Sequence, residues 1–187
     1  MTEFTSTDCY LPIPIKSINR SDILLYAMTQ TFSQSGHNGK YSFLQIELPE
    51  SFIEQDTFLK FVRDEWNIKP AAFRIHKMDP NTYYVFHSDS GRGASINMML
   101  SEGSDSITYF KAGEEHVLMY NIIPLVYELD NYYLINSQAP HGAISGPRDR
   151  YLLSISLGIK IVDQPMMVFN EYRSKLYSKY KELYSKK

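Results

Sequence analysis

The segment "FHSDSGRGAS" at residues 86–95 places two metal-binding residue types two positions apart. His87 offers an imidazole nitrogen and Asp89 a carboxylate, and both groups are common ligands of transition metals. In an extended segment, residues i and i+2 point to the same side, so both side chains can face one ion while Ser88 points away. The pair therefore predicts two ligands of a metal ion, against the alternative of a polar turn between two strands.

A third ligand has to come from elsewhere in the chain. His141, in "NSQAPHGAISGPRDRYLLSIS", is the candidate because it follows a predicted strand and precedes a Gly/Pro turn. Two neutral imidazoles and one carboxylate on one face of an iron(II) ion leave three coordination positions open, as in non-haem oxygenases and unlike a closed structural zinc site. Two of these positions suit a chelating 2-oxo acid, and the third suits dioxygen.

The strand after His141 supplies a cation for the far end of such an acid. Arg150 lies nine residues after His141, and a guanidinium binds a carboxylate through two parallel hydrogen bonds. We expect one face of this strand to line a ligand-enclosing barrel and the other to pack against helices. The inner face would carry Arg150, Leu152, Ser154 and Ser156, and the outer face Tyr151, Leu153, Ile155 and Leu157.

The order of these residues resembles the Fe(II)/2-oxoglutarate-dependent oxygenase superfamily: His-x-Asp, a His about fifty residues later, and an Arg about ten residues after that. The Arg and "ASIN" after the His-x-Asp, and "PHGAISGPRDRYLLSIS", are similar to its aspartyl/asparaginyl β-hydroxylase-like branch. The resemblance spans roughly residues 70–160. It implies a double-stranded β-helix fold, iron held by His87, Asp89 and His141, 2-oxoglutarate held by Arg150, and O2 as the oxidant.

The chain departs from this family pattern at three positions. Many relatives have a Ser two residues after the 2-oxoglutarate Arg, where this chain has Leu152, so Ser154 is predicted to take that role. Arg148 shares a face with Arg150 and takes its place if the turn is shifted. The nucleic-acid dealkylating branch has a second Arg where this chain has Ser156, so a nucleic-acid substrate is not expected.

Other polar residues near the motif have two interpretations each. Arg92 either binds a substrate carboxylate or is a solvated turn residue. Asn97 either contacts 2-oxoglutarate or substrate, or makes structural hydrogen bonds. The remaining histidines are predicted to be packed or surface residues without a second ligand; they are His37, His76 and His116.

Residue periodicity predicts a mainly β chain with flanking helices, in a jelly-roll, cupin-like arrangement. Helices are expected over residues 21–32, 50–66 and 165–184. The second of them is expected to begin with a Ser51–Glu54 capping box. Between them, short segments rich in β-branched and aromatic residues alternate with turn signals, which favours an antiparallel sandwich or barrel. The expected strands are 71–78, 82–89, 93–100, 106–113, 121–129, 131–138 and 150–161.

The length of 187 residues fits one domain. We divide it into an N-terminal helical support (1–69), a jelly-roll core (70–162) and a C-terminal amphipathic helix (163–187). That helix is basic, in a chain of net charge −2, and has an apolar stripe predicted to pack against the barrel or against a second copy in a homodimer. The stripe consists of Leu176, Tyr180, Leu183 and Tyr184.

The chain shows no leader pattern and no apolar run that could span a bilayer, and its single cysteine, Cys9, fits a reducing compartment. We therefore expect a cytoplasmic oxygenase that hydroxylates a small polar metabolite, a free amino acid or a peptide side chain. The alternative is a non-catalytic jelly-roll module for binding or assembly that uses the basic C-terminal helix. A cupin-type metalloenzyme is less favoured because the chain lacks the His-x-His and later Glu of cupins.

Overall fold

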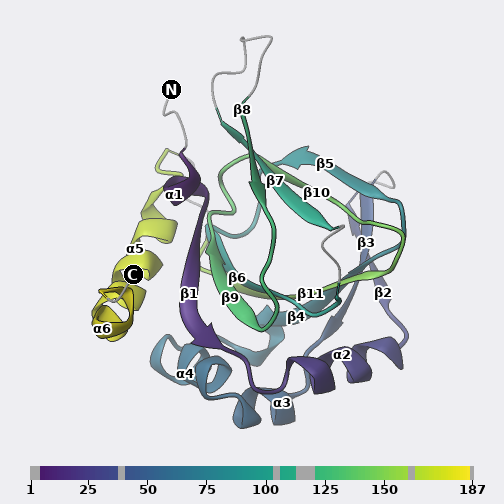
Figure 1. Cartoon of the computed structure of the whole chain (residues 1–187), viewed down its shortest axis with the longest axis horizontal. Coiled ribbons are helices and arrows are strands. Elements are labelled where there is room, and N and C mark those ends of the chain that lie inside the picture. Colours follow the sequence, from purple (N-terminus) through teal and green to yellow (C-terminus); the bar gives the residue numbers. More distant parts are fainter. Residues whose placement is uncertain (1–4, 38–40, 103–105, 113–120, 160–162, 186–187) are drawn as a thin grey trace.

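Two antiparallel sheets face each other, and helices cover the outer side of the larger sheet (Figure 1). The computed structural model describes residues 5–37, 41–102, 106–112, 121–159 and 163–185. Within these ranges the fold class is the one predicted from the sequence, mainly β with flanking helices. No helix in this part of the chain is both long and apolar enough to cross a bilayer.

The larger sheet has seven strands in the spatial order β1-β9-β6-β11-β4-β3-β2. The central strand, β11, pairs with β6 on one side and with β4 on the other. The strands of this sheet are β1 (Tyr10–Lys16), β2 (Ser33–His37), β3 (Tyr41–Glu47), β4 (Phe73–Met78), β6 (Ala94–Met99), β9 (Asn131–Ile135) and β11 (Arg150–Leu157).

The smaller sheet has four strands in the order β5-β10-β7-β8. They are β5 (Tyr83–His87), β10 (His141–Ile144), β7 (Ile107–Ala112) and β8 (Asn121–Leu125). From β4 onward the chain alternates between the sheets except at β7 and β8, which follow each other in the smaller sheet. The segments after β5 and after β9 therefore each cross from one sheet to the other. These two crossing segments carry or precede the predicted metal ligands.

The larger sheet separates an apolar core from a polar interior because its side chains alternate. On β11, Tyr151, Leu153, Ile155 and Leu157 belong to the core beneath the helices. The opposite side of β11 lines a cavity between the sheets with Arg150, Leu152 and Ser154. The two predicted faces of this strand are therefore confirmed for these seven residues, whereas Ser156, also predicted on the inner face, is not among the residues that line the cavity.

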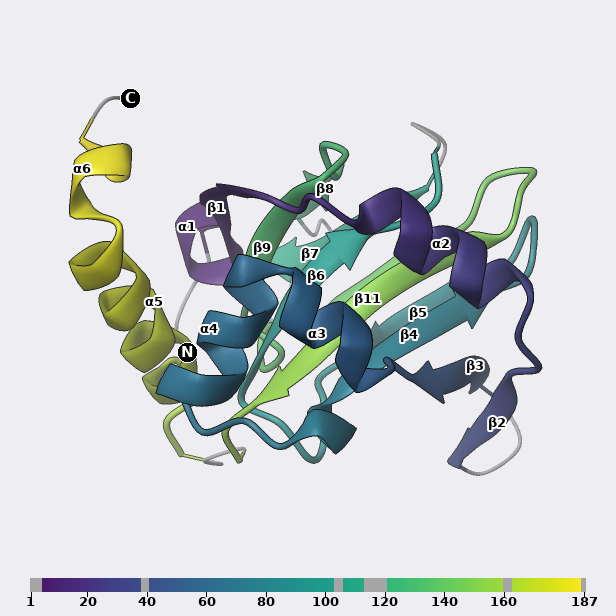
Figure 2. The same ribbon diagram turned by 90° about the horizontal axis from the view of Figure 1, so that it is seen from below.

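The helices lie mainly on the outer face of the larger sheet, as Figure 2 shows for α2, α3 and α4. Buried side chains from these helices and from α5 join the core of that sheet. The helical segments are α1 (Ser6–Cys9), α2 (Arg20–Met28), α3 (Glu50–Gln55), α4 (Thr57–Glu65), the 3-10 turn η1 (Pro70–Ala72), α5 (Met167–Lys179) and α6 (Lys181–Tyr184).

Four strands were not expected from the sequence: β1, β2, β3 and β10. The first three lie in a region for which only helices were predicted. β1 contains Pro12 and Pro14, which argue against a central strand, but β1 is an edge strand of the larger sheet, where proline is tolerated. β10 is only four residues long and contains Gly142, so it is too short for an alternating pattern.

Asp56, rather than the predicted capping box, organises the second helical region. α3 begins after Pro49, and Ser51 lies inside the helix, so the Ser51–Glu54 box does not form. The backbone at Asp56 is extended and separates α3 from α4. Its Oδ1 caps α4 by accepting from the amides of Phe58 and Leu59 at 2.9 and 3.1 Å. Its Oδ2 accepts from the hydroxyls of Ser17 at 2.8 Å and Tyr132 at 2.9 Å.

The single C-terminal helix predicted from the sequence is divided at Tyr180 into α5 and α6, and both pack on their own chain. Leu176 is fully buried, and Tyr180 and Tyr184 pack against the same core. The predicted packing against the barrel domain is therefore observed, and Leu183, at 38% exposure, is the member of the stripe that stays most open. A homodimer through this helix remains a prediction.

Asp56 should be far more important for stability than Ser51. Asp56→Ala removes the cap of α4 and leaves the buried Tyr132 hydroxyl without its acceptor, so the free energy of unfolding should fall by about 2–4 kcal/mol. Ser51→Ala is the matched control because Ser51 is exposed and makes no capping bond. Its effect should stay below about 0.5 kcal/mol. Urea unfolding of both variants measures the difference, and equal losses would contradict this account.

Candidate metal centre

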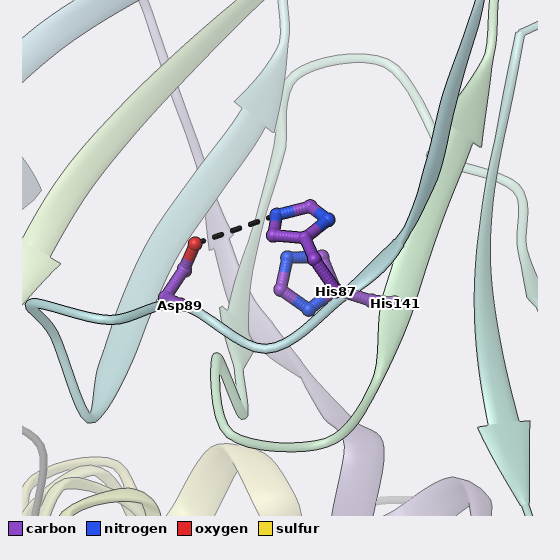
Figure 3. Close-up of side chains that lie close together, drawn as sticks. All are labelled: His87, Asp89 and His141. Atoms are coloured by element: carbon purple, nitrogen blue, oxygen red, sulfur yellow. Dashed lines mark ion pairs between the residues drawn. The ribbon is translucent and has the colours of Figure 1, made fainter. Parts of the chain in front are cut away.

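Three potential metal ligands converge between the two sheets (Figure 3). His87 is the last residue of β5, and His141 is the first residue of β10. The two lie directly opposite each other in the antiparallel pairing, with ring centroids 4.5 Å apart. Asp89 follows two residues after His87, in the segment that crosses to β6. One ligand atom from each of the three residues lies within 4.8 Å of the others.

The backbone fixes which nitrogen of each histidine faces the site. The Nδ1 of His87 lies 2.9 Å from the carbonyl oxygen of Val85, and the Nδ1 of His141 lies 2.9 Å from that of Ala139. A carbonyl oxygen can only accept, so both Nδ1 atoms carry the hydrogen. In the neutral rings, Nε2 then has a free lone pair, which is the form that binds a metal.

The facing atoms of His87 and Asp89 favour a cation between them. The Nε2 of His87 lies 3.5 Å from Oδ1 of Asp89. In the neutral tautomer set by Val85, both atoms are acceptors, and two acceptors facing each other repel. A proton on Nε2 or a metal ion relieves this repulsion, and a metal can also use the lone pair of His141. The donor set therefore fits a divalent transition metal.

The protonation states of the site also suit metal binding. Burial lowers the pKa of His141 to about 4, so this imidazole is neutral near pH 7. Burial works to raise the pKa of Asp89, but the charge of Arg92 and the hydrogen bond that it donates hold this pKa well below its usual range. Asp89 is therefore an anion. One carboxylate and a neutral imidazole are available as ligands without the loss of a proton.

The ligands lie in the wall of a cavity that both sheets line. The predicted site residues Arg92, Asn97, Arg150 and Ser154 line the same cavity, although they come from different parts of the chain. Its other lining residues are His76, Met78, Tyr84, Ser95, Thr108, Ile135, Gly142, Ala143 and Leu152. The cavity is therefore polar around the ligands and along β11, with apolar side chains between them.

Arg150 is a buried cation without an anionic partner in the described part of the chain. It is 5% exposed, and burial lowers the pKa of its guanidinium. Its Nη2 donates to Oγ1 of Thr108 at 2.9 Å, and its Nη1 lies 3.4 Å from Sδ of Met78. Its Nε has no hydrogen-bond partner among the described residues. A buried charge in this state is unfavourable unless an anion joins it.

Arg148, the alternative to Arg150, lies elsewhere. It is exposed and does not line this cavity, but borders a smaller hollow beside the turn that precedes β11. Asn97 is buried, and its Nδ2 lies 3.4 Å from the Tyr127 hydroxyl. Like Nε of Arg150, Oδ1 of Asn97 has no partner in the described ranges. Two polar atoms without partners therefore point to a ligand in the same cavity.

Arg92 makes hydrogen bonds to both Asp89 and Ser154. Nε of Arg92 donates to Oδ2 of Asp89 at 2.6 Å, and Nη1 donates to Oγ of Ser154 at 3.0 Å. Ser154 is 2% exposed, so Arg92 fills the corner between the ligand and β11. The roles predicted for these two residues, substrate binding and 2-oxoglutarate binding, remain predictions.

His76 was expected to be an ordinary strand histidine, but it lines the cavity. Burial and the charges of Arg92, Arg74 and Arg150 lower its pKa to about 3. Thr108, the partner of Arg150, was also missed, although its position between outward-facing Ile107 and Tyr109 on β7 indicates an inward side chain. His116 lies outside the described residues, as does the side chain of His37.

No protein-family model and no curated protein sequence matches this chain. Solved structures do match. The fold is similar to that of a prolyl hydroxylase from Trichoplax adhaerens, in complex with a hypoxia inducible factor peptide, with 11% identity, a TM-score of 0.55 and 85% of each chain covered. It is also similar to SnoN, a non-heme alpha ketoglutarate dependent epimerase from nogalamycin biosynthesis, with 9% identity, a TM-score of 0.53, and 79% of this chain and 76% of that one covered. At such low sequence identities, the structural similarity is evidence for the fold alone. It confirms the predicted double-stranded β-helix.

The metal-free protein should lose stability as the pH falls from 7 to 5. The unfolded chain takes up protons on histidine near pH 6.5, whereas folded His76 and His141 stay neutral until about pH 3 and 4. The unfolded state therefore binds more protons in this window, and each histidine contributes at most about 1.4 kcal/mol per pH unit. Urea unfolding at several pH values should show a smaller loss for His76→Gln than for the wild type. An identical pH dependence in the two proteins would mean that His76 is not held neutral.

Proposed function

We propose that this protein is an Fe(II)/2-oxoglutarate-dependent oxygenase of the aspartyl/asparaginyl β-hydroxylase-like branch. It hydroxylates a small polar metabolite, a free amino acid or a peptide side chain. The observation that carries this proposal is the presence in one cavity of a His87–Asp89–His141 cluster and a buried Arg150 that has no anionic partner among the described residues. The two halves correspond to a metal site and an anion site.

The ligand set supports iron(II). Two histidines and one carboxylate with open positions on the other side are diagnostic of non-haem iron(II) oxygenases, whereas structural zinc sites are closed by four protein ligands. In the described ranges, no fourth His, Cys, Asp or Glu joins the cluster. Bound iron would activate dioxygen for attack on an unreactive C–H bond. The protein's own contribution is to hold three ligands on one side and leave the other side open.

The charge of the cavity supports 2-oxoglutarate as co-substrate. Among the described lining residues, Arg92 and Arg150 are cations, and Asp89 is the one carboxylate. Arg92 is paired with Asp89, so the positive charge of Arg150 remains for a ligand. A distal carboxylate can bind Nε and Nη2 of Arg150 side by side. The Thr108 hydroxyl, which accepts from Arg150, can turn to donate to the same carboxylate.

The cavity places apolar side chains next to the charged groups of the site. It lies between two sheets, and Met78, Ile135 and Leu152 contribute apolar wall between its polar groups. Low local polarity strengthens the interaction of Arg150 with a carboxylate. The two histidines lie at one end of β5 and β10, where the crossing segments begin and end. The substrate class itself rests on the sequence resemblance.

The metal and the co-substrate can be tested without knowing the substrate. Under anaerobic conditions, Fe(II) followed by 2-oxoglutarate should produce a weak visible charge-transfer absorption that requires both additions. His87→Ala should abolish it because two protein ligands remain. If the wild-type protein shows no such band and retains no iron, the oxygenase proposal is contradicted and the binding-module alternative is favoured.

Arg150 and Arg148 form a matched pair for the co-substrate site. Arg150→Met removes the buried cation, so the 2-oxoglutarate concentration needed for half of the absorption change should rise by about 10- to 100-fold, the loss typical of a buried charged hydrogen bond. Arg148→Met should leave it unchanged because Arg148 is exposed outside the cavity. The opposite result would assign the co-substrate to Arg148.

A further inference from the structure

The two oxygens of Asp89 have different surroundings. Oδ1 lies on the side of the ligand cluster, 3.5 Å from Nε2 of His87. Oδ2 accepts a short, charge-assisted hydrogen bond of 2.6 Å from Nε of Arg92. Figure 3 shows Asp89 reaching toward the two imidazoles from the crossing segment. The carboxylate therefore presents one oxygen to a metal while its other oxygen is already bound.

Arg92 is itself fixed from two directions. Its Nη1 donates to Oγ of Ser154, on the central strand of the larger sheet. Its backbone carbonyl accepts from Nε2 of Gln138 at 2.6 Å. The guanidinium plane is rigid, so two bonds on adjacent nitrogens set its orientation toward Asp89. To bind a substrate, this guanidinium would have to leave both partners.

Gln138 joins the two segments that cross between the sheets. Its Nε2 also donates to the carbonyl of Asp89 at 3.0 Å, and its own carbonyl accepts from Oγ of Ser88 at 3.0 Å. The amide of Asp89 donates to the carbonyl of Ser137 at 2.9 Å. Gln138 is 7% exposed and lies three residues before His141. The segment with Asp89 and the segment that leads to His141 are therefore one hydrogen-bonded unit.

We propose that Arg92 and Gln138 are positioning residues of the metal centre. Arg92 holds the second oxygen of Asp89, so that the carboxylate offers the metal a single oxygen, and Gln138 fixes the two ligand-bearing segments to each other. Without Arg92, Asp89 can rotate and bind through both oxygens, which would occupy a position that the co-substrate or dioxygen needs. This inference rests on the proposed metal site, but not on the identity of the substrate.

Co(II) is a suitable probe because its visible d–d bands report the number and geometry of its ligands. The metal-free, full-length proteins to compare are the wild type, Arg92→Met, Arg92→Lys and the control Arg148→Met. Arg92→Met should bind Co(II) about 10- to 100-fold more weakly, the usual effect of losing a group that orients a metal ligand. Its d–d bands should also change in position and intensity. Arg92→Lys keeps a cation and should recover part of the affinity, and Arg148→Met should match the wild type.

The outcomes separate this inference from the proposed function. If the wild type takes up no Co(II), the metal site itself is wrong. If the wild type binds Co(II) and Arg92→Met binds it equally well with the same bands, the metal site stands and the positioning role of Arg92 is overturned. Weaker binding with unchanged bands, together with a lower free energy of unfolding in urea, would show a merely structural role and would also overturn it.

Gln138 is tested through its coupling to Arg92. Gln138→Leu should weaken Co(II) binding by about tenfold. Because both residues act on the same unit, the double variant Arg92→Met/Gln138→Leu should lose less affinity than the product of the two single losses. Losses that multiply in full would show that the two residues act independently and would contradict their assignment to one unit.

Discussion

The antiparallel pairing of β5 with β10 places His87 directly opposite His141, and the arrangement of the metal centre depends on it. The register shifts between His141 and Ala143, so that Ala143 pairs with Tyr84. Gly142 makes this shift possible because a Cβ at this position would lie 2.6 Å from the carbonyl oxygen of Tyr84. A larger residue would push the strands apart and separate the imidazoles. The distance between the two imidazoles therefore depends on the absence of a side chain at Gly142.

The larger sheet supports the site by separating two environments. The outer face of β11 is anchored in the core under α2, α3, α4 and α5, so its inner face is rigid. That inner face holds Arg150 and Ser154, and Ser154 in turn fixes Arg92 next to Asp89. The smaller sheet brings the histidines. Rigid elements on both sides of the cavity can hold the ligand atoms without a bound metal, as pre-organised sites require.

Sequence patterns predicted the parts of the fold that depend on local periodicity. The alternation on β11 identified both of its faces, and the spacing of His87, Asp89 and His141 identified residues that the fold brings together. Features that depend on distant partners were missed. The prolines of β1 hid an edge strand, and the buried bonds of Asp56 to Ser17 and Tyr132 gave no signal because these partners are far away in sequence. Gln138 was also missed. Its sequence context is that of a polar loop residue, and its hydrogen-bond partners lie on the other crossing segment.

The metal centre can be tested by the anomalous scattering of iron in a crystal grown without oxygen in the presence of Fe(II) and 2-oxoglutarate. We expect one iron peak bound to Nε2 of His87, one oxygen of Asp89 and Nε2 of His141. The distal carboxylate of 2-oxoglutarate should lie on the guanidinium of Arg150. Iron bound elsewhere, or a co-substrate held at Arg148 with Arg150 left unpaired, would contradict these expectations.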